Sequence, residues 1–133
     1  MKNWTIRLAI AAATLLLSST AALAGEKKLM HCFAFTVIDE ATAADWDAFK
    51  SATDALPGKI PGLTKIWHGK LSRPLTVYNA KGDKLTRQHA VCMEMDGPDT
   101  LKAYSANPAH ADWLKAYEKV RKPGTTTYDI NGE

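Results

Sequence analysis

Tyr104 and His110 are the two residues of this sequence whose types and spacing best suit acid–base chemistry. They flank Asn107 and Pro108 in the stretch YSANPAH. Asn favours the position just before a helix, and Pro suits the first helical position because its missing N–H would have no partner there. The pair therefore predicts that one helix ends and another begins here. His110 then lies in the first turn, where the positive helix end lowers the pKa of the imidazole and keeps the ring neutral at pH 7.

A neutral histidine near the protein interior can accept a proton. The inward face of the new helix is predicted from residues at positions i, i+3, i+4 and i+7, which are His110, Trp113, Leu114 and Tyr117. Tyr104 can donate a hydrogen bond toward the same space. We therefore take His110 as the candidate catalytic base and Tyr104 as the candidate hydrogen-bond donor to the substrate. The alternative is that both side chains only pack in the core or line a binding site.

The first 24 residues have the pattern of a signal peptide. Lys2 and Arg7 precede an apolar run at 8–17, and the small-x-small sequence ALA ends at residue 24. The run is shorter than the roughly 20 residues that span a membrane, so we expect cleavage after Ala24 and no stable membrane association. A periplasmic or secreted protein with a single domain over residues 25–133 is expected.

Charge argues against nucleic acid as a partner. Two of the 17 basic residues lie in the signal segment, which leaves 15 basic against 14 acidic residues and lowers the net charge from +3 to +1. A nearly neutral surface binds phosphate backbones poorly. Export also bears on Cys32 and Cys92, which lie in expected neighbouring strands. They are either one cross-strand disulfide or two buried thiols, depending on the register of those strands.

The elements that position these residues follow from periodicity and from helix-end signals. Thr42 and Asp45 form a capping pair that opens the first helix, which ends at Pro57-Gly58. The second helix opens at Gly97-Pro98, and the helix after Asn107 continues to about residue 121. Strands are expected at 29–38, 64–68, 88–95 and 125–130. The segment 69–87 is hard to assign, although Lys81-Gly82-Asp83 suits the turn of a small hairpin.

The order β-α-β-β-α-β predicts an α+β, ferredoxin-like fold. Two right-handed crossovers place both helices on one face of a four-stranded antiparallel sheet. The strand at 29–38 is apolar on both faces, so its other face needs a cover. A second copy of the chain is the simplest cover, and we expect a homodimer packed sheet to sheet.

Four stretches of the sequence together resemble the stress-responsive α/β-barrel (Dabb) family, from His31 to Ile130. They are HCFAFTV, IPGL, HAVCMEM and LKAYSANPAHADW. The most specific part is the Tyr-x-x-x-Pro-x-His spacing of Tyr104, Pro108 and His110. The resemblance implies a dimeric α/β barrel, a link to stress, and a pocket between sheet and helices in each subunit.

The resemblance also implies roles for individual residues. In a plant polyketide cyclase of the family, the histidine of this motif is the base and the tyrosine assists the carbonyl, roles that fall here on His110 and Tyr104. His31 and His89 match strand histidines of the same pocket. With Phe33 and Trp113, they are the expected pocket residues. The chain departs from the family pattern at Asn107, where many members carry histidine, and in a longer segment between its second and third strands.

Three functions are compatible with these observations. The first is binding of a small, largely apolar molecule in the subunit pocket. The second is a lyase or cyclase reaction on a carbonyl compound. The third is haem binding or monooxygenation, as in related dimeric barrels, with His110 or His68 as iron ligand. The histidines lack the close spacing of zinc motifs and no C-x-x-C-H is present, so we expect no metal and no cofactor.

Overall fold

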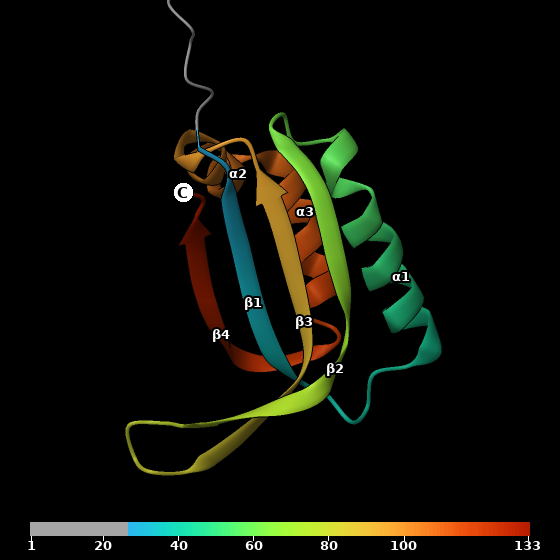
Figure 1. The fold of residues 1–133 in the computed structure, drawn as a ribbon. Helices are drawn as coiled ribbons and strands as arrows, with labels where there is room; N and C mark the ends of the chain where they lie inside the picture. The colour runs from blue at the N-terminus through green and yellow to red at the C-terminus, as the bar shows by residue number, and fades with distance from the viewer. Residues whose placement is uncertain (1–26) are drawn as a thin grey trace, which may run out of the picture.

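A computed structural model describes residues 27–133 of the chain (Figure 1). The predicted signal peptide, residues 1–24, lies outside the described residues. The elements follow in the order β1 (Leu29–Val37), α1 (Ala43–Asp54), a short 3-10 helix η1 (Leu56–Gly58), β2 (Leu63–Tyr78), β3 (Lys84–Met95), α2 (Pro98–Ala106), α3 (Pro108–Tyr117) and β4 (Arg121–Asn131). Within residues 27–133, no helix has the length and apolar content to span a membrane.

The sheet has the strand order β2-β3-β1-β4, and every neighbouring pair is antiparallel. The helices cover one face of this sheet, behind the strands in Figure 1, and the other face is open toward the viewer. The predicted ferredoxin-like α+β fold is therefore confirmed. We call the face turned away from the helices the open face.

The hydrophobic core lies between the sheet and the helices. Phe35 from β1 and Met93 from β3 are fully buried, and aromatic rings from the helices pack against them. The Phe35 ring lies 5.0 Å from that of Tyr117 in α3 and 5.9 Å from that of Phe49 in α1. This aromatic layer fixes both helices against the same strands, and so fixes where the helix side chains meet the sheet.

The start of α1 follows the predicted capping pair. Thr42 Oγ1 accepts a hydrogen bond from the backbone N–H of Asp45 at 3.2 Å. The Asp45 carboxylate in turn accepts one from the backbone N–H of Thr42 at 3.0 Å. Two N–H groups of the first turn are thereby satisfied, and this prediction is confirmed.

The last helix and the last strand differ from their predicted bounds. Helix α3 ends at Tyr117 rather than near residue 121, and β4 already begins at Arg121 rather than at Thr125. Pro123 and Gly124 therefore lie inside a strand. An edge strand tolerates proline because one side of its backbone has no neighbouring strand to bond, and β4 is at the edge of this sheet.

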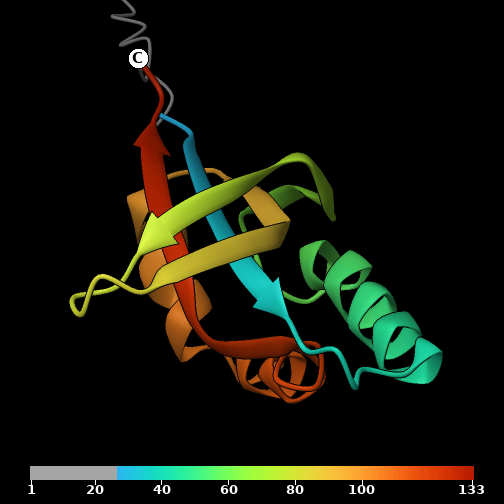
Figure 2. The same ribbon diagram turned by 90° about the horizontal axis from the view of Figure 1, so that it is seen from below.

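The segment that was hard to assign forms a long β2–β3 hairpin. The predicted second strand, 64–68, is too short, because β2 continues to Tyr78 and pairs with β3 down to Lys84. The predicted turn is confirmed: Asn79 closes the loop by bonds to Asp83, and Gly82 has a φ of 85°. The pairing register shifts between Lys70 and Leu75, and beyond that shift the hairpin projects past the helices (Figure 2).

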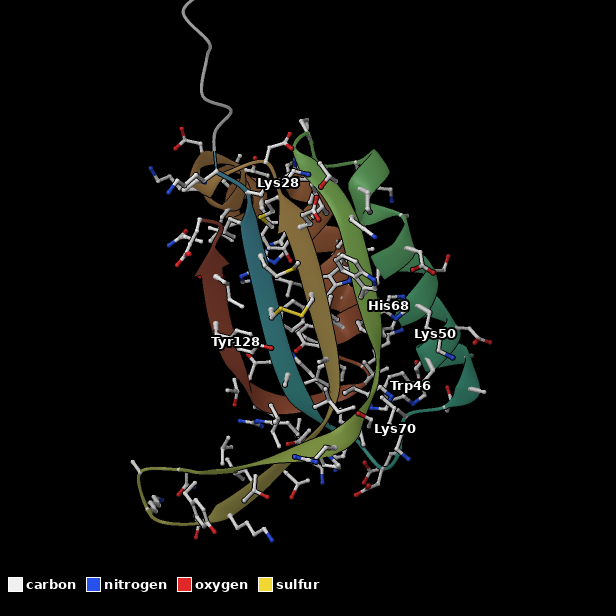
Figure 3. All side chains as sticks on the ribbon, in the orientation of Figure 1. Lys28, Trp46, Lys50, His68, Lys70 and Tyr128 are labelled. Carbon is white, nitrogen blue, oxygen red and sulfur yellow. A yellow bond between two sulfur atoms is a disulfide. The ribbon has the colours of Figure 1, made fainter. Side chains whose placement is uncertain are left out.

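The open face carries a row of side chains that crosses all four strands. Pairing places Trp67 opposite Cys92, Cys92 opposite Cys32, and Cys32 opposite Tyr128. The two cysteines form a disulfide, with Cα atoms 4.2 Å apart. Of the two alternatives left open by the sequence, the structure therefore contains the cross-strand bond. Trp67 and Tyr128 remain about half exposed, and Figure 3 shows Tyr128 on the face turned to the viewer.

Candidate functional site

A cavity of about 250 Å³ lies between the sheet and α3, and we call it the α3 pocket. Its walls come from β1, α2, α3 and β4. The lining residues are His31, Phe33, Tyr104, Ser105, His110, Trp113, Leu114, Tyr117, Arg121, Thr125 and Thr127. The β2–β3 hairpin contributes none of these residues.

The α2–α3 junction positions the first end of the pocket. Helix α2 ends at Ala106 and α3 begins at Pro108, as predicted, and the Asn107 side chain caps α3 by accepting the N–H of Ala109 at 2.8 Å. The chain turns sharply at this cap. As a result, the rings of Tyr104 and His110 face one another with their centroids 4.3 Å apart.

The pKa of the His110 imidazole lies below its usual value, which favours the neutral ring at pH 7. Burial is the main cause of this lowered pKa, and the nearby His31 lowers the pKa of His110 further. A hydrogen bond with the Ser105 backbone raises it and so opposes both effects. The direction agrees with the prediction, but burial rather than the helix end is the main cause. Burial also raises the pKa of Tyr104, which is only 3% exposed. Tyr104 therefore keeps its proton and can donate a hydrogen bond beside a ring that can accept a proton.

His31 contributes a second imidazole, held by Asp129. The two residues are opposite one another in the β1–β4 pairing, and His31 Nδ1 lies 2.6 Å from the Asp129 carboxylate. In the tautomer whose Nδ1–H donates a hydrogen bond to that carboxylate, Nε2 is left as a hydrogen-bond acceptor. The His31 ring lies 5.8 Å from that of Tyr104. Sequence reasoning missed Asp129, because only the strand register brings it to His31.

The middle of the pocket is apolar and rigid. Phe33 from β1 and Trp113 from α3 pack edge to face with centroids 5.7 Å apart. The indole N–H of Trp113 donates to Thr53 Oγ1 at 2.9 Å, which fixes the ring. Leu114 completes this wall. Such walls favour an apolar portion of a ligand.

The second end of the pocket is formed by Tyr117 and Arg121. The Arg121 guanidinium lies over the Tyr117 ring, 4.6 Å from its centroid. The Tyr117 hydroxyl and Arg121 Nε are both buried, yet neither has a hydrogen-bond partner among the residues described. Tyr117 was predicted to face inward, whereas Arg121 was missed because it was expected to be the last residue of a helix.

His89, an expected pocket residue, does not line the α3 pocket. It pairs with Phe35, four positions along β1 from His31, and its ring packs at 4.6 Å from that of Trp46. Burial lowers its pKa, and Lys70 and Lys50 add to this effect. Figure 3 shows Trp46, Lys50 and Lys70 together on the α1 side of the sheet.

The structure therefore brings together five of the six predicted site residues, Tyr104, His110, His31, Phe33 and Trp113, but not His89. His68, the other histidine considered for iron, is outside this pocket and lies 2.7 Å from the Asp54 carboxylate. Within residues 27–133, no three His, Cys, Asp or Glu side chains are grouped as a metal site would need.

Comparison with known proteins gives one family. The model of the family described as Stress responsive A/B Barrel Domain (Dabb) matches residues 29–131. No curated protein matches this chain.

Solved structures similar to the chain share its fold. A dimeric protein of unknown function with a ferredoxin-like fold from Bacteroides fragilis is 25% identical, and the match covers 78% of this chain and 95% of that protein with a TM-score of 0.59. A dimeric ferredoxin-like protein from Thermobifida fusca is 22% identical, with 80% and 92% covered and a TM-score of 0.60. The hydroxynitrile lyase from Passiflora edulis is 12% identical, with 82% and 95% covered and a TM-score of 0.62. At their identities, the last two show likeness of fold alone.

Proposed function

Since the chain belongs to the stress-responsive A/B barrel (Dabb) family, we propose that it acts as a homodimer whose α3 pocket binds a small, largely apolar molecule. The observation that carries this proposal is the pocket itself. Aromatic walls from Phe33 and Trp113 enclose a cavity that has a few polar groups at its ends. Ligand sites are typically apolar clefts with a small number of placed polar groups.

Binding is tested with octan-1-ol as an apolar probe, followed by two-dimensional NMR. We expect saturable shifts of the Trp113 indole signal in the unmodified protein. Leu114→Trp fills the pocket and should weaken binding at least tenfold. Lys115→Trp adds the same side chain at the next, exposed position of α3 and should leave binding unchanged. Absence of binding to the unmodified protein, or equal binding to Leu114→Trp, would contradict the proposal.

The homodimer is supported by the open face. Trp67, Tyr128 and Ile130 expose 45%, 46% and 55% of their surface there, which marks an interaction surface. Similar structures include proteins described as dimeric. Tyr128→Lys should shift the mass in solution, measured by light scattering, from dimer to monomer. Ala48→Lys, which adds the same charge on the helix side, should leave the dimer intact.

Export to the periplasm or the medium is the third part of the proposal. The signal-peptide pattern at 1–24 and the Cys32–Cys92 disulfide support it, since disulfides persist in oxidising compartments. Intact mass spectrometry of protein from the exporting cell should give a chain that begins at Gly25 and carries the disulfide. A full-length, reduced chain in the cytoplasm would contradict it. The same measurement under native conditions reveals any retained ligand.

Proton transfer next to a carbonyl is a second candidate function. The specific observation that favours it is the contact of Tyr104 with His110, together with His31 and its Asp129 partner at the same end of the pocket. In this reaction His110 takes the proton from the carbon beside a carbonyl. Tyr104 donates a hydrogen bond to the carbonyl oxygen as it becomes negative. An aldol-type cyclase would begin with this step, as would a lyase that eliminates a group from the second carbon away from the carbonyl.

The step can be measured without knowing the natural substrate. The probe is octan-2-one in D2O, and NMR follows the exchange of the protons next to its carbonyl. We expect His110→Ala to slow the protein-catalysed exchange by about 10²–10⁴-fold, the usual contribution of a general base. His89→Gln, a histidine outside the pocket, should not change the rate. If the unmodified protein does not accelerate exchange over buffer, the second candidate is rejected while the binding proposal stands.

A further inference from the structure

We propose that the ligand of the α3 pocket carries a carboxylate, which Arg121 and Tyr117 bind at the end of the pocket opposite His110. This inference rests on the proposed binding function and adds the chemical class of the ligand. A neutral apolar molecule would use only the middle of the pocket. A medium-chain apolar carboxylate would use the middle and this second end.

The first observation is that two hydrogen-bond donors are buried at this end without an acceptor. Tyr117 is 4% exposed, and its hydroxyl has no hydrogen-bond partner within the described part of the chain. Arg121 Nε is also buried and has no hydrogen-bond partner among the described residues. Buried donors are nearly always satisfied in proteins, so two unsatisfied donors on residues that line a cavity call for an acceptor from the ligand.

The second observation is the charge at this end. The carboxylate nearest to Arg121 is that of Glu118, 3.9 Å from Nη2 and largely exposed to solvent. Arg87, whose charge also acts on Tyr117, is 6% exposed and donates hydrogen bonds to two neutral hydroxyls, those of Thr126 and Thr36. Two guanidinium groups therefore act on one hydroxyl, and the Glu118 carboxylate that opposes Arg121 is largely exposed to solvent. An anion bound there would be attracted by both and bonded directly by Arg121.

The contrast with the first end supports a carboxylate rather than a cation. There, the carboxylate of Asp129 is already engaged by His31 at 2.6 Å. Burial raises the pKa of Tyr117, so its hydroxyl stays protonated and acts as a donor. The second end thus offers a guanidinium and a hydroxyl donor, which together match the oxygens of one carboxylate.

The third observation is the distance between the two ends. His110 and Tyr117 are seven positions apart on α3, which corresponds to roughly 10 Å along the helix axis. Trp113 and Leu114 lie between them and form the apolar wall. A ligand bound by Arg121 through its carboxylate would extend an apolar chain along this wall toward His110 and Tyr104.

Matched probes test the inference. Octanoate and octan-1-ol have the same chain and differ in the polar end group. Calorimetric titration at pH 7 should give octanoate an affinity at least tenfold higher than that of octan-1-ol. Arg121→Gln should weaken the binding of octanoate at least tenfold more than it weakens the binding of octan-1-ol. Tyr117→Phe, which keeps the ring under Arg121, should weaken octanoate several-fold.

Controls separate the carboxylate contact from overall charge and from folding. Arg73→Gln removes the same charge from an exposed position of the β2–β3 hairpin and should change neither affinity. Arg121→Lys retains the charge and should keep part of the preference for octanoate. Equal affinities for both probes in the unmodified protein would overturn the carboxylate while leaving pocket binding intact. Binding of neither probe would overturn both proposals.

Discussion

The sheet has two histidine-containing regions on its helix side, and they differ in what surrounds the ring. His110 faces Tyr104 at one end of a cavity, close to the His31–Asp129 pair. His89 is enclosed by the rings of Phe35 and Trp46 on the α1 side of the sheet. Burial lowers the pKa of both residues. A lowered pKa therefore does not by itself distinguish these two histidines, whereas the cavity that only His110 lines does.

Removal of the disulfide that links the two regions is expected to change the stability of the protein strongly. It joins β1, which carries His31, to β3, which carries His89, and closes a loop of 60 residues. Loop-closure entropy predicts that the double variant Cys32→Ala/Cys92→Ala loses about 4 kcal/mol of unfolding free energy. Urea unfolding of both proteins with and without reductant measures this. Reductant should lower the midpoint of the unmodified protein only, and an unchanged midpoint there would contradict the prediction.

Two tryptophans give the second test. Trp113 in the α3 pocket is 3% exposed and hydrogen-bonded, so Trp113→Ala should cost about 3–5 kcal/mol of unfolding free energy. Trp46 beside His89 is only partly buried, so Trp46→Ala should cost about 1–2 kcal/mol. Both values come from denaturant unfolding. Equal losses would mean that the region around His89 is packed as firmly as the pocket.

The smallest effect is expected in the dependence of stability on pH. His110 and His89 have pKa values below 6.5 in the folded protein, so the unfolded chain binds more protons as the pH falls through 6.5. The contribution of these two histidines to the free energy of unfolding should therefore be fully present above about pH 7 and decrease below pH 6.5. His110→Gln and His89→Gln should each flatten part of this decrease, measured by urea unfolding at several pH values. A curve unchanged in both variants would contradict the burial of these rings.

Ligand binding should change the pKa of only one of the two histidines. An apolar probe such as octan-1-ol in the α3 pocket removes water from around His110, so the pKa of His110 should fall further. The pKa of His89 should not change, because its ring is not part of that pocket. NMR titration of the imidazole signals with and without the probe measures both values. Equal changes at both rings would mean that the two regions are coupled.

Local signals in the sequence predicted the parts of this comparison that depend on local structure. Asn107 and Pro108 determine their own helix junction, because the cap and the first helical position are set by neighbouring residues. Thr42 and Asp45 predicted the start of α1 for the same reason. These features required no knowledge of the tertiary fold.

Features that depend on strand pairing were not accessible from the sequence. Asp129 meets His31 only through the β1–β4 register, and His89 is displaced from His31 because it pairs with Phe35. The length of β2 was missed because Pro74 resembles the end of a strand, although β2 is an edge strand where proline is tolerated.

The prolines in the two outer strands also determine how a second copy can approach. Pro74 lies in β2 and Pro123 in β4, the strands at the two edges of the sheet. Neither proline can donate a backbone hydrogen bond to an added strand, and a register shift interrupts β2 next to Pro74. Continuous growth of the sheet from one molecule to the next is therefore disfavoured at both edges. Both edges are thus protected against fibril-like association, while the open face stays available for contact with a second copy.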